Sequence, residues 1–432
     1  VVWEGIKSVI KKITRQIRTI EAICVTSFGE ASVLLDKDGI VLDKSYLFTD
    51  PNGQEECDEI TTTVDKDYIY EHTGIVPGKM YSVCKWSWQK KHKPEIWGKV
   101  KYICLFEDYI VYKLTGIRQI DYSLATRTMA FDIYSLKWNT KILDAAGIDE
   151  SMLSKVVPIG EKAGNMSSQI KEELGFVNQP VIVSGCHDQI AAAIGSGVFH
   201  EHQGVDGTGT VECITVAFSK DDKIDKTLLQ KGGFAIVPYM KDLFVTYAFS
   251  YTGGALLKWY RDKLSPMEAK TAYENGQNPY DVYNRGVSDK EPSELLILPY
   301  FAGAGTPYMD NGAKGLIAGL TMDTTKEKIY QGIMEGCSYE MKLNLNQLQK
   351  AGIKADKLFA TGGGANSKEW LHIKADIYDK EIISLGAAES GTVACILLAG
   401  VACGRFRNLE EASKEFITYR DTYFPRKGVK EK

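Results

Sequence analysis

The stretch VIVSGCHDQIAAAIGSG, residues 181–197, joins an apolar run to an alanine-rich run. The run Val181–Val183 predicts a buried strand, and the residues after Gln189 predict a helix. His187 and Asp188 stand where the strand ends, which is where open α/β sheets bind ligands. An aspartate near a helix N-terminus is favoured in its ionised form and can act as a general base. The alternatives are that Asp188 is only an N-cap and that His187 is only a hydrogen-bonded core residue.

Strands and helices alternate on both sides of this stretch, which indicates the α/β class. A chain of 432 residues is too long for one core, so two domains are expected. The polar and proline-containing residues 178–180 predict a boundary that separates a domain over 1–179 from one over 180–432. Residues 80–116 are predicted to be helical. A long helix is predicted within residues 321–348, with Thr324 and Glu327 as a capping box.

The composition excludes several classes of partner. Lysine and arginine number 52 against 56 acidic residues, and the net charge of −4 gives no reason to expect nucleic acid or an anionic membrane surface. No run of 18 apolar residues is present, so no membrane span is predicted. The nine cysteines lack the spacing of metal ligands and mostly stand in apolar runs, which is typical of a cytoplasmic, reducing location.

Three turns rich in glycine predict a site for phosphate groups. The turn DGTGTVE over 206–212 offers backbone N–H groups, and the hydroxyls of Thr208 and Thr210 are further possible donors. The turn TGGGANS over 361–367 lies between a predicted strand and a predicted helix, and another glycine pair opens the helix that carries Lys258. Each turn alone could be an ordinary connection. Neither GxGxxG nor GxxxxGK[ST] is present, which disfavours dehydrogenases and Walker-type ATPases.

Taken in order and spacing, these motifs resemble the FGGY family of carbohydrate kinases, and within it the xylulose-kinase-like members. The stretches that carry the resemblance are 85–97, 106–116, 121–138, 184–197, 206–212, 305–336 and 360–378. The resemblance implies two actin-like, ribonuclease-H-like domains of the sugar kinase, hsp70 and actin superfamily, with a cleft between them. The domain over 1–179 would bind sugar, and the domain over 180–432 would bind nucleotide and carry the catalytic aspartate.

The resemblance also implies an activity, the transfer of the γ-phosphate of ATP, with Mg²⁺, to a hydroxyl of a small sugar or polyol. It makes Asp188 the catalytic base and leaves the metal ligands unidentified. The substrate-binding residues that it implies are Glu30, Trp88, Asp121, Tyr122 and Gln189. The nucleotide-binding residues that it implies are Gly207, Thr208, Gly209, Gly254, Lys258, Gly363, Gly364 and Lys368. Glu30 stands where usual xylulose kinases carry a sugar-contacting histidine. A pentulose such as xylulose therefore competes with glycerol, a tetritol or a pentitol as acceptor.

One feature of the family is missing from the sequence. Family members open with a hairpin that bears Asp-x-Gly-Thr, and nothing similar precedes the helix that begins near Val1. By comparison with the usual family length, roughly fifty residues are expected to be missing, and truncation is the favoured explanation. The absence also motivates a competing hypothesis, a catalytically inactive protein that binds sugar or nucleotide. A homodimer is expected by analogy with the family.

Overall fold

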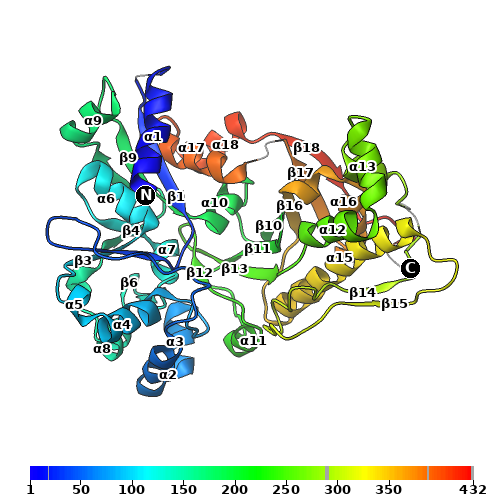
Figure 1. The fold of residues 1–432 in the computed structure, drawn as a ribbon, viewed down its shortest axis with the longest axis horizontal. Helices are drawn as coiled ribbons and strands as arrows, with labels where there is room; N and C mark the ends of the chain where they lie inside the picture. The colour runs from blue at the N-terminus through cyan, green and yellow to red at the C-terminus, as the bar shows by residue number, and fades with distance from the viewer. Residues whose placement is uncertain (18, 288–290, 387–388, 430–432) are drawn as a thin grey trace. The chain divides into compact units, whose positions relative to one another are not determined.

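The protein is described here by a computed structural model that covers residues 1–17, 19–287, 291–386 and 389–429 (Figure 1). Contacts between Cα atoms divide the chain into two compact units, as the resemblance implies. The first unit comprises Val1–Gly195, Ile236–Lys241 and Gly391–Phe416. The second unit comprises Ser196–Ala235, Asp242–Ser390 and Ile417–Lys432. Each unit mixes helices with strands, so the predicted α/β class is confirmed.

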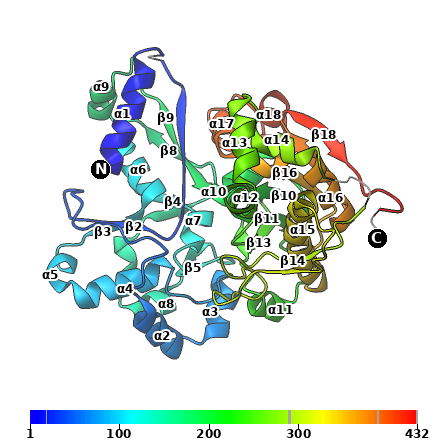
Figure 2. The same cartoon turned by 45° about the vertical axis from the view of Figure 1, so that its right-hand side comes forward.

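The central strand of the first unit is β9 (Val181–His187). It pairs in parallel with β1 (Ala22–Ser27) and antiparallel with β8 (Lys162–Asn165), which gives the order β1-β9-β8. Helix α10 (Asp188–Gly195) continues directly from β9. Figure 2 shows α6 (Phe106–Thr115) alongside these strands, and its contacts with all three place it against the sheet.

The division between the units follows Gly195, whereas the sequence placed a boundary after Gln179. The difference arises because β9 is the middle strand of the first unit's sheet and cannot be separated from β1 and β8. The polar residues before Val181 therefore form a loop inside the first unit. As a result, Asp188 belongs to the first unit.

Residues 80–116 do not form a continuous helical region. They fold as α4 (Ser82–His92), α5 (Pro94–Trp97), β3 (Tyr102–Leu105) and α6. Pro94 interrupts the helical hydrogen bonds, and the short apolar run at β3 pairs antiparallel with β2 (Ser32–Leu35). The helical prediction is therefore wrong at β3, because a four-residue strand has too little periodicity to stand out.

The remaining elements of the first unit surround these strands. They are α1 (Val2–Thr14), α2 (Gln54–Thr63), α3 (Lys66–Thr73), β4 (Gln119–Asp121), α7 (Tyr122–Thr126), β5 (Phe131–Asp132), β6 (Lys137–Trp138), α8 (Thr140–Ala146), η1 (Glu150–Met152), β7 (Lys155–Val157), α9 (Ser168–Leu174), β12 (Val237–Pro238), α17 (Ser390–Ala402) and α18 (Leu409–Phe416). One apolar core of this unit includes two residues of α6. Its buried members are Val25, Val111, Leu114, Ala163, Met166, Leu174, Phe176 and Ile182.

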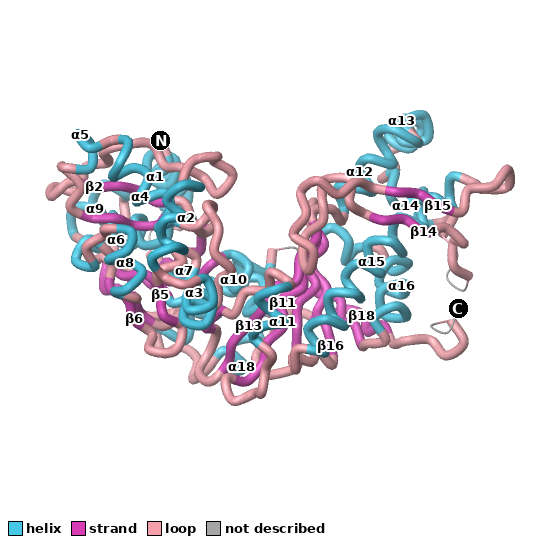
Figure 3. The backbone as a smooth tube through the Cα atoms, turned by 90° about the horizontal axis from the view of Figure 1, so that it is seen from below, coloured by secondary structure: helices cyan, strands magenta, loops and turns pink. Residues whose placement is uncertain are grey.

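The second unit is built on a mixed sheet. The strands that this unit contributes to the sheet are β10 (Gln203–Thr208), β11 (Glu212–Ser219), β13 (Leu243–Ser250), β16 (Lys357–Thr361), β17 (Glu381–Leu385) and β18 (Tyr419–Tyr423), in the order β13-β11-β10-β16-β17-β18. Strands β10, β16 and β17 are parallel, and the other neighbours are antiparallel. Figure 3 shows α15 (Lys326–Lys350) and α16 (Lys368–Tyr378) beside each other along the strands.

The predicted long helix and the predicted strand, glycine turn and helix over 357–378 are both confirmed. The N-cap of α15 is Thr325 rather than Thr324, since the Thr325 side chain accepts a hydrogen bond from the Lys328 N–H. The other elements of this unit are α11 (Lys226–Lys231), α12 (Gly254–Trp259), η2 (Tyr260–Leu264), α13 (Pro266–Glu274), α14 (Pro279–Asn284), β14 (Leu296–Leu298), β15 (Leu316–Ala318) and η3 (Gly363–Asn366).

All nine cysteines of the chain are free thiols. Cys57, Cys84, Cys104, Cys186 and Cys337 are buried, as small core side chains are, whereas Cys24 and Cys395, which also stand in apolar runs, are only partly buried. Within the part of the chain that the structure describes, no helix combines the length and the apolar character that crossing a bilayer requires.

Candidate functional site

Asp188 is the first residue of α10 and follows the last residue of β9. Its side chain is 52% exposed, and one carboxylate oxygen, Oδ1, lies 3.3 Å from Nε2 of His187. Partial burial raises the pKa of the Asp188 carboxyl, and the backbone N–H of Gln189 opposes that rise. The carboxylate is thus accessible, held by its neighbours and slightly more basic than an ordinary aspartate.

The backbone before Asp188 is held by a short chain of hydrogen bonds. The His187 N–H donates to Oγ of Ser123 at 2.9 Å, and the Ser123 hydroxyl donates in turn to Oδ1 of Asp121. Burial, and then the charge of Arg127, hold the pKa of His187 well below its usual value, so the imidazole is neutral. Asp121 itself is fully buried and caps α7, so it supports this loop from beneath.

Glu30 lies in the loop after β1, with a left-handed backbone conformation at φ 62°. Its Oε1 accepts a hydrogen bond from Nε of Arg127 at 2.6 Å, and its backbone oxygen accepts one from Ser82 at 2.7 Å. A Cβ atom on Gly29 would lie 2.7 Å from Cγ of Arg127, so glycine leaves the space that this side chain fills. The charges of Glu30 and Arg127 both act on the pKa of Asp188.

Arg127 is the residue of this site that sequence reasoning missed. It stands in the stretch DYSLATRTMAFD, which contributed to the resemblance, but no local pattern marked it. We use the term acceptor site for Glu30, Arg127, His187 and Asp188, all of which lie in the first unit. Gln189 is half-buried beside Asp188 on α10.

Two predicted substrate-binding aromatics, Trp88 and Tyr122, are half-buried in the first unit. The ring of Trp88 stacks on His92 with centroids 5.1 Å apart and meets Tyr46 edge-on at 5.4 Å. Tyr122 stacks on Phe131 at 5.6 Å. These rings are held firmly by their neighbours, and their contact with a substrate stays a prediction.

The three glycine turns meet in the second unit, at a pocket of about 660 Å³. Thr208 and Gly209 come from the first turn, Gly254 and Lys258 from the second, and Gly363 and Gly364 from the third. Of the predicted nucleotide-binding residues, two do not line this pocket in the described structure. Gly207 lies one residue earlier within β10, and Lys368 has a 76% exposed side chain 3.9 Å from Glu369.

Close backbone approach brings the turns together. A Cβ atom on Gly364 would lie 2.6 Å from Cγ2 of Thr208, so only glycine fits there without a shift. The N–H of Gly254 donates to the Gly209 carbonyl at 2.8 Å, and that of Ala255 donates to the Thr210 carbonyl at 3.0 Å. The turn over 209–211 is therefore fastened to the first turn of α12.

The Thr208 hydroxyl is already engaged within the protein. It accepts a hydrogen bond from Nζ of Lys374 at 2.6 Å and donates its single proton to Oδ1 of Asp206 at 3.2 Å. In this arrangement the Thr208 hydroxyl proton is not available to a phosphate. Thr210 also lines the pocket.

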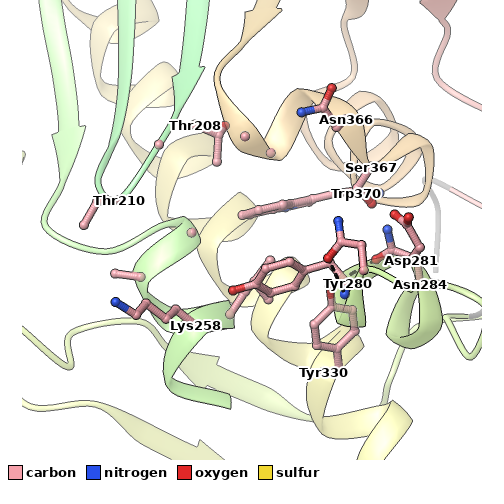
Figure 4. Close-up of a pocket in the computed structure, with 17 residues that line it drawn as sticks. Thr208, Thr210, Lys258, Tyr280, Asp281, Asn284, Tyr330, Asn366, Ser367 and Trp370 are labelled. Atoms are coloured by element: carbon pink, nitrogen blue, oxygen red, sulfur yellow. Dashed lines mark hydrogen bonds between the residues drawn. The ribbon is translucent and has the colours of Figure 1, made fainter. Parts of the chain in front are cut away.

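The pocket has two chemically different ends (Figure 4). Trp370 lies on one side, Tyr280, Asn284 and Tyr330 lie on the other, and Thr208, Thr210 and Lys258 are at the far end. Trp370 and Tyr330 are buried, whereas Tyr280 and Asn284 are partly exposed. The Tyr330 hydroxyl donates to Oδ1 of Asn284 at 3.1 Å. The NH₂ group of Asn284 can therefore donate to a different partner. A planar ring with an anionic tail suits this arrangement.

No metal centre is evident in the part of the chain that the structure describes, since no three His, Cys, Asp or Glu side chains there are grouped to hold an ion.

The N-terminal domain model of the FGGY family of carbohydrate kinases matches residues 1–195, and the C-terminal domain model matches 208–403. The chain belongs to the FGGY family of carbohydrate kinases. The two matched regions contain the acceptor site and all the residues that line the second-unit pocket, respectively. Membership confirms the resemblance, the two-domain sugar-kinase fold and the class of reaction, phosphoryl transfer to an alcohol group.

Individual members of the family resemble this FGGY kinase over nearly its whole length. Xylulose kinase of Staphylococcus epidermidis is 26% identical over 424 residues, which cover 98% of this chain and 82% of that protein. Glycerol kinase 2 of Saccharolobus solfataricus is 28% identical over 435 residues, covering 96% and 82%. The crystal structure of gluconate kinase from Lactobacillus acidophilus has the same fold, with a TM-score of 0.87 at 23% identity, and the match covers 100% of this chain and 85% of that one.

Proposed function

We propose that this FGGY kinase transfers the γ-phosphate of ATP to a hydroxyl of a small neutral sugar or polyol, with a pentulose such as xylulose as the first candidate. In this proposal the first unit binds the acceptor and supplies the base Asp188. The second unit binds ATP. The observation that carries the proposal is the pair of sites, an accessible aspartate among polar side chains and a pocket with one aromatic and one glycine-rich end.

The pocket in the second unit supports ATP as the phosphate donor. Tyr280 presents a partly exposed ring on which an adenine can stack, and Asn284 presents NH₂ donors for a ring nitrogen. At the other end, Gly209, Thr210 and Lys258 line the pocket, and the Lys258 ammonium supplies a positive charge for the phosphates. The order of these groups along the pocket matches the order of base and phosphates in ATP.

The acceptor site supports Asp188 as the base. The acceptor oxygen forms a bond to the γ-phosphorus as the bond to the bridging oxygen breaks and ADP leaves, and the hydroxyl proton passes to the Asp188 carboxylate. In this proposal neutral His187 carries its proton on Nε2, which lies 3.3 Å from Oδ1 of Asp188 and can orient the carboxylate. Mg²⁺ is expected to enter with the triphosphate and to neutralise part of its charge, and no residue of this chain is assigned to it.

The charges of the acceptor site favour a neutral substrate over a sugar acid. Within the acceptor site, Glu30 and Asp188 are carboxylates, Arg127 is a cation, and His187 is neutral. Because Arg127 is already paired with Glu30, a substrate carboxylate would meet excess negative charge. This supports a neutral acceptor such as xylulose, the sugar named in the S. epidermidis relative, or glycerol, a tetritol or a pentitol, rather than gluconate.

A coupled ADP-release screen tests the proposal. The acceptors are xylulose, ribulose, glycerol, erythritol, xylitol and gluconate, each with ATP and magnesium. We expect release with at least one neutral acceptor, the highest kcat/KM with xylulose, and none with gluconate. If none of these acceptors gives ADP release, the result favours the alternative, a protein that binds sugar or nucleotide without turnover.

The proposal includes a cytoplasmic location, which the nine free thiols support, since disulfides are rare in reducing compartments. The homodimer expected by analogy with the family stays a prediction. The measured mass of the full chain by light scattering, compared with 48.0 kDa for one copy, tests it.

A further inference from the structure

Lys374 is a buried cation beneath the turn that joins β10 to β11. It comes from α16, and its side chain is 1% exposed. Its Nζ lies 2.6 Å from Oδ2 of Asp206, 2.6 Å from Oγ1 of Thr208 and 2.8 Å from Oε1 of Glu212. Three acceptors therefore use the three N–H groups of the ammonium. Asp206 and Thr208 lie before the turn over 209–211, and Glu212 lies after it, so one side chain holds both sides of the turn.

The same ammonium also reaches the aromatic end of the pocket. Its Nζ lies 5.0 Å from the ring centroid of Trp370, which stands one helical turn earlier on α16 and lines the pocket. Glu212 accepts a further hydrogen bond from the Tyr378 hydroxyl at 3.2 Å. Lys374 is not among the residues that line the pocket in the described structure. It supports the wall from behind and does not face a ligand.

Stability alone gives little reason for this arrangement. One ammonium and two carboxylates are buried together, and such clusters are often no more stable than apolar side chains of similar volume. Burial alone lowers the pKa of Lys374, but Asp206 and Glu212 outweigh it and the pKa is raised. The lysine is therefore charged over the whole working range of pH. What the cluster supplies is a fixed geometry for the turn.

We propose that Lys374 is a positioning residue for the phosphates of ATP. It turns the Thr208 hydroxyl inward and, through Asp206 and Glu212, holds both ends of the turn over 209–211, whose residues Gly209 and Thr210 line the pocket. Because Thr208 is held, Gly364 can pack directly against its methyl group and complete the glycine-lined end. The inference rests on the proposed binding of ATP in this pocket, and it adds a residue that does not itself contact the nucleotide.

Titration calorimetry on the full chain with ATP, ADP and adenosine tests the proposal. Lys374→Met removes the charge and keeps an unbranched side chain. We expect the Kd for ATP and ADP to rise about tenfold or more, an effect of the size of one lost hydrogen bond. The Kd for adenosine should stay within about twofold of the wild-type value. A cluster that only stabilised the fold would change the melting temperature without separating ATP from adenosine.

Thr208→Val provides a second test, because Lys374→Met leaves two buried carboxylates without their cation and can prevent folding. Valine keeps the shape of threonine and leaves the contacts of Lys374 with Asp206 and Glu212 intact. The same selective loss of ATP and ADP affinity is expected.

Each outcome bears on one of two claims. If the folded variants lose affinity for adenosine and ATP equally, or lose affinity for neither, the positioning role is wrong although the pocket binds nucleotide. If the wild-type chain binds neither ATP nor adenosine, the proposed function fails and the inference fails with it.

Discussion

Arg127 donates from Nε to Oε1 of Glu30 at 2.6 Å, across 97 residues of sequence. The guanidinium also lies over the ring of Tyr81, 5.3 Å from its centroid, and Cβ and Cγ of the same side chain pack beside Gly29. It is therefore held on three sides next to Asp188. The pair gives the acceptor site a fixed hydrogen-bonding edge and places a positive charge near the proposed base.

Arg127→Met is expected to shift the pH dependence of the reaction. The base must be ionised, and the charge of Arg127 lowers the pKa of Asp188 against the rise caused by burial. Removal of that charge raises the pKa, so the acidic limb of kcat/KM moves to higher pH. The measurement is kcat/KM for the best acceptor across the acidic range.

Arg127→Lys is the matched control. It keeps the positive charge and loses the planar, forked geometry, so the acidic limb stays near that of wild type while the KM for sugar rises. A Met variant with the wild-type pH profile would mean that Arg127 does not act on Asp188.

Gly364→Ala is expected to push two turns of the pocket apart. The new Cβ would lie 2.6 Å from Cγ2 of Thr208 and 3.2 Å from Cζ3 of Trp370. The melting temperature of the unliganded chain should fall, and the KM for ATP should rise about tenfold, the effect of roughly 1.4 kcal/mol. For stability the control is Gly363→Ala, whose Cβ would meet no atom within 4 Å. Equal melting temperatures for the two variants would contradict the packing described here.

Tyr280→Ala is expected to weaken the binding of adenosine and of ATP by the same factor. Base stacking on an aromatic ring contributes about 1–3 kcal/mol, so both dissociation constants should rise roughly five- to 150-fold. Tyr280→Phe keeps the ring and should retain most of the affinity. This pattern is the opposite of that expected for Lys374→Met, and titration calorimetry separates the two. If the variant lost affinity for ATP but not for adenosine, adenine would not stack on Tyr280.

Asp108 is expected to make the stability of the chain depend on pH. It is fully buried, its Oδ2 accepts a hydrogen bond from Ser154 at 2.5 Å, and burial raises its pKa from 3.8 to about 7. The folded state therefore binds this proton more tightly than the unfolded state. The stabilisation is complete below about pH 4 and is lost as the pH rises through about 7.

Asp108→Asn removes that dependence. The quantity measured is the free energy of unfolding in urea. The difference between the variant and wild type should be about 1–4 kcal/mol more favourable to the variant at pH 8 than at pH 4. A difference between the two proteins that is the same at both pH values would show that Asp108 does not titrate in this range.

The sequence predicts features that depend on neighbouring residues. The apolar positions of α15 recur with helical spacing, and Ile333, Met334 and Cys337 are indeed buried. The turn over 361–367 follows an apolar strand and precedes a helix, so its place at the end of a strand could be predicted locally. The three glycine turns are expected to form one site, and residues of all three line one pocket.

Features that depend on distant pairing could not be predicted in this way. The first unit extends to Gly195 because β9 pairs with β1, more than a hundred residues earlier in the chain. Lys374 and Asp206 are 168 residues apart, and Tyr280 and Trp370 come from different helices. No local periodicity connects such residues. The resemblance implied that Asp121 binds substrate, but the structure shows it fully buried as the N-cap of α7.

The central claim is that Asp188 accepts the proton of the acceptor hydroxyl. Asp188→Asn keeps the size of the side chain and removes the base, and steady-state kinetics with the best acceptor from the screen measures the effect. The account predicts a fall in kcat of several orders of magnitude, with ATP affinity by calorimetry unchanged and sugar affinity changed far less than kcat. A variant that kept most of its turnover would contradict the account.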